Sequence, residues 1–124
     1  MLTLLSVQTS LLVEQSGPLF RFPTTFWPEQ LAAEALAAFG RIDVLINNAG
    51  GLVGRTKIED YTEEYLARIV ALNVTQVALF MHEVIPVMRR QKGGNVINVS
   101  SIAARHGGGG GSVLYAGAKG FIST

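Results

Sequence analysis

The sequence predicts an α/β fold, a partial doubly wound parallel sheet with flanking helices, and three observations lead to this prediction. Helix-type and strand-type patterns alternate from Pro28 to the end of the 124-residue chain. Two short apolar runs, residues 44–46 and 96–99, are typical of strands that are buried on both faces. The helical segment between them is long enough for the right-handed crossover that joins parallel strands.

The first clear element is a helix over residues 28–39, a run rich in helix-forming residues. Pro28 suits the first turn of this helix, and Gly40 suits its C-terminal cap. The first strand follows at 44–46, and the tetrad Asn47-Asn48-Ala49-Gly50 comes directly after it. The apolar side chains that share one face of the helix, and that we expect to face the core, are Leu31, Ala35, Leu36 and Phe39.

A long second helix is predicted from Thr62, a suitable N-cap, to about Arg90. Its middle, residues 69–81, is apolar on nearly every side, which indicates burial against the sheet and against something outside it. We expect Pro86 to bend or loosen the last turns, and Gly93-Gly94 to end the helix. We also expect that no stretch of the chain is long enough to span a bilayer.

The second strand, 96–99, is followed by Ser100 and Ser101, by five consecutive glycines at 107–111, and by a helix that begins at Ser112. In doubly wound sheets, ligands bind at the carboxyl ends of the strands. Because the tetrad and Ser101 each follow a strand, we expect both to lie at that edge of the sheet.

Residues 1–27 are left unassigned, and residues 28–124 are interpreted as one domain. Residues 2–5 or 19–22 would suit a strand, and a turn at Gly17-Pro18 separates the two. The apolar start lacks the basic residues of a signal peptide, so secretion is only a minor alternative.

Charge and composition narrow the possible functions. The formal net charge is +1, so nothing directs the chain to nucleic acid or to an anionic membrane. There are no cysteines, which excludes disulfides and is compatible with a cytoplasmic location. His82 and His106 are far apart in the sequence, so we expect no metal site. Charged residues make up only 15%, so we expect some apolar surface to be covered, either by a partner subunit or by further chain.

Tyr115 and Lys119 form the first candidate catalytic pair. They are four residues apart at the start of a predicted helix, so they lie side by side on one face. A free phenol is not ionised at neutral pH, but a nearby ammonium favours the phenolate, which could exchange a proton with an alcohol or carbonyl oxygen. Taken alone, this spacing is a weak motif, and an ordinary helix explains it better.

Three other polar sites join this pair. The Ser101 hydroxyl could bind a substrate oxygen or satisfy a turn, and Ser100 competes for the first role. Asn73 lies within an apolar helix, so its amide needs a partner, either water, a main-chain group or a ligand, unless it only bends the helix. The small residues of the tetrad allow close approach of a ligand and its amides can tie strands together, although a plain structural turn is the alternative.

Together these motifs resemble the central part of a classical short-chain dehydrogenase/reductase, and in particular the group around 3-oxoacyl-carrier-protein reductases and sugar or polyol dehydrogenases. The resemblance covers residues 39–124. The matching text is, in the order of the family, FGRIDVLINNAG at 39–50, Asn73 in LNV, NVSS at 98–101 and YAGAKG at 115–120.

The resemblance implies a Rossmann-like fold, NAD or NADP as the cofactor, and a small alcohol or carbonyl compound as the substrate. It implies Tyr115 as the general acid/base and Lys119 as the group that activates it and binds the nicotinamide ribose. Ser101 would hold the substrate oxygen, and Asn73 would keep a water in a proton relay that ends at Lys119. The residues implied on the ribose side of the cofactor are Asn47, Ala49 and Gly50, with Tyr115 and Lys119.

The family pattern is incomplete at both ends, so we expect a fragment truncated at both ends. Family members begin with a glycine-rich turn for the pyrophosphate of the cofactor, whereas Gly17 is the only glycine before Gly40. They also continue beyond the catalytic helix, and this chain has one residue more than usual between Ser101 and Tyr115. We therefore expect impaired cofactor binding.

The resemblance also implies a homo-oligomer that forms through the helices carrying Asn73 and Tyr115. One alternative to an enzyme is a non-catalytic α/β remnant that pairs with full-length relatives through these helices. Another is a small-ligand binder that uses the same crevice without turnover.

Overall fold

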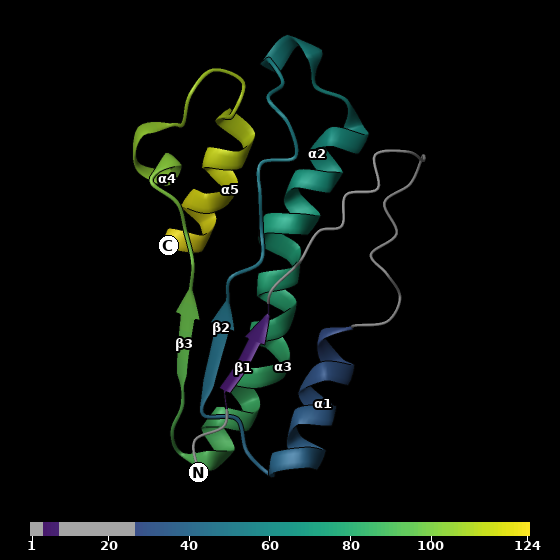
Figure 1. The fold of residues 1–124 in the computed structure, drawn as a ribbon, viewed down its shortest axis with the longest axis vertical. Helices are drawn as coiled ribbons and strands as arrows, with labels where there is room; N and C mark the ends of the chain where they lie inside the picture. The colour runs from purple at the N-terminus through teal and green to yellow at the C-terminus, as the bar shows by residue number, and fades with distance from the viewer. Residues whose placement is uncertain (1–3, 8–26) are drawn as a thin grey trace.

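Three parallel strands form the sheet of this computed structural model, which describes residues 4–7 and 27–124. The strands are β1 (Leu4–Val7), β2 (Val44–Asn47) and β3 (Asn95–Asn98), and they lie in the order β1-β2-β3 (Figure 1). In the register of the sheet, Leu45 of β2 is aligned with Leu5 and with Val96. The predicted parallel α/β architecture is confirmed.

The strand β1 lies in the segment that the sequence left unassigned. It pairs with β2 over its whole length, so these residues belong to the same sheet as the rest of the fold. Of the two candidate strands in this segment, the structure therefore has the one near the start. The other, at 19–22, lies outside the described residues.

Helix α1 (Pro28–Phe39) has the ends that the sequence predicts. Pro28 occupies its first turn, and Gly40 adopts a left-handed conformation with φ of 72° while its N–H donates to Leu36 O at 2.8 Å. The predicted core face is wrong in one place, because the side chain of Phe39 is 54% exposed. The residues of α1 that are buried are Ala32 and Ala35, whose small side chains let the helix approach the core closely.

The long helix is confirmed, and it contains a π-helical turn. It runs through α2 (Glu63–Val70), the turn η2 (Ala71–Thr75) and α3 (Gln76–Gln91). Thr62 caps it as predicted, since Oγ1 accepts from the N–H of Tyr65 at 3.1 Å. The helix continues through Pro86, and the residue that ends it is Lys92, with φ of 60°, rather than a glycine.

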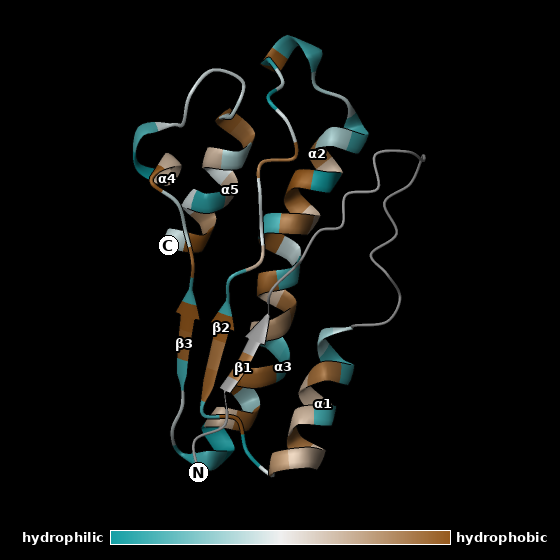
Figure 2. Cartoon of the chain, viewed as in Figure 1, coloured by the Kyte–Doolittle hydropathy of each residue, from teal (hydrophilic) through white to brown (hydrophobic). Residues whose placement is uncertain are grey.

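Helices α1 and α3 lie side by side on the same side of the sheet (Figure 1). This arrangement follows from two right-handed crossovers that both move in the same direction, from β1 to β2 and from β2 to β3. The hydrophobic core lies between these helices and β2, which is among the most apolar parts of the chain (Figure 2). Its buried residues are Ala32, Ala35, Ile42, Leu45, Ala49, Phe80, Val84 and Met88.

The expectation that both strands are buried on both faces is wrong for β3. Ile97 is 49% exposed, and Val99, just beyond the strand, is 40% exposed. The physical reason is that the described helices pack on the opposite face, toward which Leu45 and Asn47 of β2 point. An apolar run predicts a strand in a two-sided sheet, but it does not reveal what covers the second face.

The expectation that no stretch is long enough to span a bilayer is also wrong. The continuous helix from Glu63 to Gln91 has 29 residues and is apolar enough to cross a membrane by length and composition. A core helix meets the same criterion, and this one places Val77, Phe80 and Val84 among the buried residues. Its apolar character is therefore explained in part by packing on the sheet.

Three short elements complete the described part of the chain. They are the 3-10 turn η1 (Ile58–Asp60), the single turn α4 (Ala103–His106) and helix α5 (Val113–Ser123). Helix α5 begins after Ser112, as predicted, and contacts η2 and α2. Helix α5 starts away from the sheet and runs toward the end at which β3 terminates, where the Ser100 hydroxyl donates to Lys119 O (Figure 1).

Candidate active site

The predicted site residues come from four elements that meet at the carboxyl ends of β2 and β3. The tetrad begins with Asn47, the last residue of β2, and Ser101 follows β3. Asn73 lies in η2, and Tyr115 and Lys119 lie in α5. Hydrogen bonds link the tetrad region to Asn73 and link the end of β3 to Lys119.

Asn73 has main-chain partners. Its side chain is fully buried, its Oδ1 accepts from the N–H of Gly51 at 3.0 Å, and its Nδ2 donates to Gly51 O at 3.1 Å and to Ile69 O at 3.0 Å. The side-chain amide of Asn73 therefore bonds both the N–H and the C=O of Gly51, as the backbone of a neighbouring β-strand would. Of the partners left open by the sequence, the structure shows the main-chain group, and this anchors the segment after β2 to the π-helical turn.

Gly50 lies where Asn73 and Lys119 approach each other. Its φ is 136°, and a Cβ on this residue would lie 2.7 Å from Asn73 Oδ1 and 2.8 Å from Lys119 Nζ. Any side chain at this position would collide with both polar atoms. The other small residue of the tetrad, Ala49, has a different place, because its side chain is buried in the core.

Lys119 is the charged group of the site. Only 5% of the residue is exposed, and its Nζ donates to Val99 O at 3.0 Å. Burial lowers the pKa of Lys119 below its usual value, because it disfavours the ammonium form. An ammonium has three N–H groups, so this bond leaves two for a ligand.

The two serines after β3 differ in their hydrogen bonds. The Ser100 hydroxyl donates to Lys119 O at 2.7 Å and lies 2.7 Å from Ser123 Oγ, so it ties the end of the strand to α5. The Ser101 hydroxyl accepts from the N–H of Ala103 at 3.2 Å, which leaves its proton free to be donated. Ser101 is therefore better suited than Ser100 to bind a substrate oxygen.

Tyr115 is half-buried, one helical turn before Lys119. Within the described residues its hydroxyl makes no hydrogen bond, in contrast to the hydroxyls of Tyr61 and Tyr65. Buried phenols normally find a partner, so an unpaired phenol beside a lysine can act on a ligand.

Asn47 ties the two central strands together, as its amide was expected to be able to do. Its Nδ2 donates to Asn98 Oδ1 on β3 at 2.8 Å. Its Oδ1 is buried without a hydrogen-bond partner in the described part of the chain, and the residue is only 2% exposed. The side chain of Asn47 thus has a structural role, while its orphan oxygen can accept one further bond.

Two residues at this end of the molecule were missed from the sequence. The Tyr61 hydroxyl accepts from the N–H of Leu114 at 3.3 Å, and Arg55 Nη1 donates to Gly110 O at 2.9 Å. Both come from the loop after β2 and contact the segment that leads into α5. The run of five glycines was the signal that another backbone approaches there closely.

The site fits the nicotinamide half of a dinucleotide cofactor. Lys119 can donate its two remaining N–H groups to the hydroxyls of a ribose. The phosphate half depends on the segment after β1, where Gly17 is the only glycine. Over residues 4–7 and 27–124, no group of three or more metal-ligating side chains occurs.

Known proteins match this chain over most of its length. A family model described as "short chain dehydrogenase" matches residues 28–124. The short chain dehydrogenase adrF of Penicillium rubens is 39% identical over 92 residues, which cover 74% of this chain and 36% of that protein. The 1,6-dihydroxycyclohexa-2,4-diene-1-carboxylate dehydrogenase of Acinetobacter baylyi is 36% identical over 77 residues, which cover 62% of this chain and 30% of that protein.

Solved structures agree with these relatives. The NADH-dependent reductase A1-R' complexed with NAD superposes with a TM-score of 0.74 at 37% identity, covering 77% of this chain and 42% of that one. Levodione reductase gives a TM-score of 0.71 at 33% identity, and the match covers 77% of this chain and 36% of that one. The chain thus spans between 30% and 42% of the length of these proteins. Together with the match over residues 28–124, they show that this chain belongs to the short-chain dehydrogenase family.

Proposed function

We propose that this chain carries the catalytic half of an NAD(P)-dependent oxidoreductase that interconverts an alcohol and a carbonyl compound. The observation that carries the proposal is the hydroxyl of Tyr115, which has no hydrogen-bond partner among residues 4–7 and 27–124 and lies one helical turn before the buried Lys119. The likeness to the reductase A1-R' complexed with NAD, and to dehydrogenases among the curated relatives, supports a nicotinamide cofactor.

In the direction of reduction, Ser101 donates its free proton in a hydrogen bond to the carbonyl oxygen of the substrate and holds it beside Tyr115. Tyr115 then donates its phenolic proton to that oxygen as the carbon receives a hydride. A nicotinamide cofactor held by Lys119 would supply this hydride, or accept it in the reverse direction. The ammonium of Lys119 stabilises the phenolate that remains.

Tyr115 must regain its proton before the next turnover. The Nζ of Lys119 and the Oδ1 of Asn73 flank the same point at Gly50, which makes a polar route from the buried lysine toward the π-helical turn. The side chain of Asn73 is already bonded to Gly51, so its proposed part is to fix this geometry for a relay water.

The second candidate function is an interaction role, and exposed apolar surface favours it. The sequence has no glycine-rich turn after β1, and α2 and α5 carry exposed apolar side chains. A chain that binds the cofactor poorly could still pair with a full-length relative through these helices. This interaction role is the alternative if cofactor binding fails.

A titration with NADH and NADPH, followed by nicotinamide fluorescence, tests the proposal. We expect saturable binding of one of them, weakened in Lys119→Ala, which removes the ribose donor, and unchanged in Lys57→Ala, which alters an exposed lysine in the loop after β2. No binding at millimolar cofactor would reject the oxidoreductase activity of this chain and leave the interaction role.

A further inference from the structure

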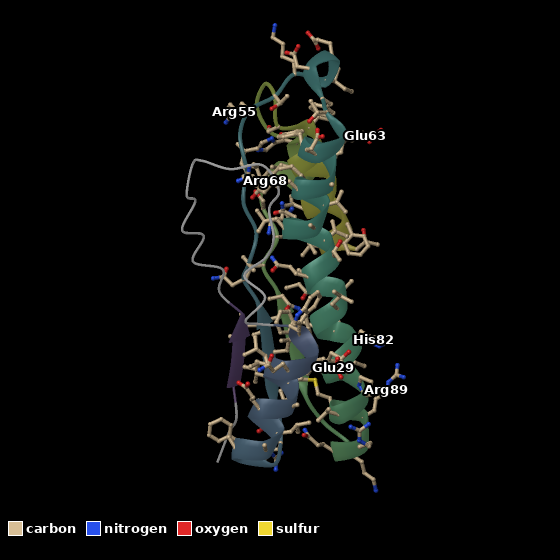
Figure 3. All side chains as sticks on the ribbon, turned by 90° about the vertical axis from the view of Figure 1, so that its right-hand side faces the viewer. Glu29, Arg55, Glu63, Arg68, His82 and Arg89 are labelled. Atoms are coloured by element: carbon tan, nitrogen blue, oxygen red, sulfur yellow. The ribbon has the colours of Figure 1, made fainter. Side chains whose placement is uncertain are left out.

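Two loops that are far apart in the sequence are docked on each other at the end of the molecule where Arg55 lies (Figure 3). One is the segment 51–57 after β2, and the other is the glycine run 107–111 before α5. Arg55 Nη1 donates to Gly110 O at 2.9 Å, and the N–H of Thr56 donates to Gly111 O at 3.0 Å. Consecutive residues of one loop therefore bind consecutive carbonyls of the other.

The glycines explain how closely the two loops approach. A Cβ at Gly109 would lie 3.1 Å from Arg55 Nη1, and a Cβ at Gly111 would lie 2.9 Å from Thr56 N. Gly111 also has a φ of 74°, which side chains rarely adopt. Gly110, in contrast, has open space around its Cβ position and no such φ. The docking therefore needs glycine at 111 but not at 110.

The docked loop leads directly into the start of α5. Ser112 at the N-cap bonds Gly109 O with its hydroxyl and does not cap the helix with its side chain. The first-turn N–H of Leu114 is bound instead by the Tyr61 hydroxyl. The first turn of α5, which contains Tyr115, is thus held by Tyr61, in the stretch between β2 and α2. The start of that stretch is anchored to Asn73 through Gly51.

We propose that Arg55 is a positioning residue, which fixes the glycine loop on the segment after β2 and so sets the start of α5 and the place of Tyr115. Arg55 acts through Gly110 and needs no contact with the substrate. Its catalytic consequence rests on the proposed function, whereas the docking itself does not.

Amide hydrogen exchange of the 124-residue chain, measured by NMR, tests the docking without cofactor or turnover. In Arg55→Ala we expect the amides of Thr56 and Leu114 to exchange at least about tenfold faster, while the Val99 amide, which donates to Asn47 O next to the sheet, keeps its rate. Arg55→Lys, which can still donate to Gly110 O, should restore both rates. Lys57→Ala, on the exposed neighbour, should leave them unchanged.

The glycine pair provides a second test. Gly111→Ala should accelerate the same amides, and Gly110→Ala should not. With 13C-labelled tyrosine, the chemical shift of Tyr115 Cζ should differ from the wild-type value in Arg55→Ala. It should have the wild-type value in Arg55→Lys and in Lys57→Ala. Wild-type exchange and an unmoved Tyr115 signal in Arg55→Ala would overturn the proposal, and so would equal effects of Arg55→Ala and Lys57→Ala.

Kinetics then separate this inference from the proposed function. In a chain that turns over, Arg55→Ala should lower kcat on the order of tenfold, with a smaller change in KM and with recovery in Arg55→Lys, because a misplaced acid slows the chemical step. If the wild-type chain has no turnover but the exchange pattern is as expected, the positioning role stands and the proposed function fails. An unchanged kcat in an active chain would contradict the positioning role.

Discussion

The phenol of Tyr115 differs from those of Tyr61 and Tyr65 in that it has no hydrogen-bond partner within the described residues. We expect Tyr115→Phe to abolish turnover, a loss of at least about 10²-fold, because it removes the only group proposed to exchange the proton. The fold should be unaffected, since no bond is lost. Steady-state kinetics and circular dichroism check both parts, and full activity in the variant would refute the mechanism.

Lys119 couples stability to pH. Its pKa is lowered by burial, so between that value and its ordinary value near 10.5 the unfolded chain binds a proton that the folded chain does not. The free energy of unfolding contributed by this residue therefore rises with pH across that window and is lowest below it. Urea unfolding at about pH 7 and about pH 10 should show wild type gaining relative to Lys119→Met. If the difference in the free energy of unfolding between the two proteins were the same at both pH values, the lowered pKa of Lys119 would be contradicted.

At the scale of single residues, motifs predicted the residues of the site but not the residues whose hydrogen bonds hold them in place. Tyr115, Lys119 and Ser101 were predicted because short spacings place them at a helix start or a strand end. Arg55 and Tyr61 could not be found this way, since their partners are main-chain groups of Gly110 and Leu114, more than fifty residues away in the sequence. Only the structure distinguishes Ser101 from Ser100, because the difference lies in their hydrogen bonds.

At the scale of elements, α3 is joined to the start of β2 by one side chain. Gln91 Nε2 donates to Ile42 O, and Gln91 Oε1 accepts from the N–H of Ile42, both at 2.9 Å. Because Ile42 is fully buried, Gln91→Ala would leave two main-chain groups without a partner. We expect a loss of about 1–3 kcal/mol in the free energy of unfolding.

Urea denaturation measures this loss, and Arg90→Ala is the matched control. Arg90 precedes Gln91 in the same last turn and is exposed, so its replacement should change stability by no more than about 0.5 kcal/mol. Equal effects of the two substitutions would show that the bonds to Ile42 contribute nothing beyond helix propensity.

The elements themselves were largely predictable, because helix periodicity and cap residues are local. The caps at Thr62 and Gly40 are examples in which the residue type alone gave the boundary. The parts that were missed depend on distant partners: β1 is a strand because it pairs with β2, and Lys92 ends α3 although glycines follow it. The π-helical turn at Asn73 likewise reflects contacts with Gly51 that no local pattern encodes.

At the scale of the whole molecule, apolar surface remains on two helices that touch each other. Leu66 and Val70 of α2 are 38% and 41% exposed, and Val113 and Phe121 of α5 are 59% and 51% exposed. We expect this surface to join two copies of the chain, because an isologous contact would bury each patch against its counterpart.

Sedimentation velocity on Phe121→Glu tests this expectation. Each substitution acts twice in a two-fold dimer and places a charge in an apolar contact, so dimerisation should weaken by at least about tenfold. Phe39→Glu is the matched control, since Phe39 is 54% exposed at the end of α1, a helix that packs on α3 rather than on α5. If Phe39→Glu dissociates the dimer and Phe121→Glu does not, the contact lies on α1. A monomeric wild type would contradict the expected homo-oligomer through α2 and α5.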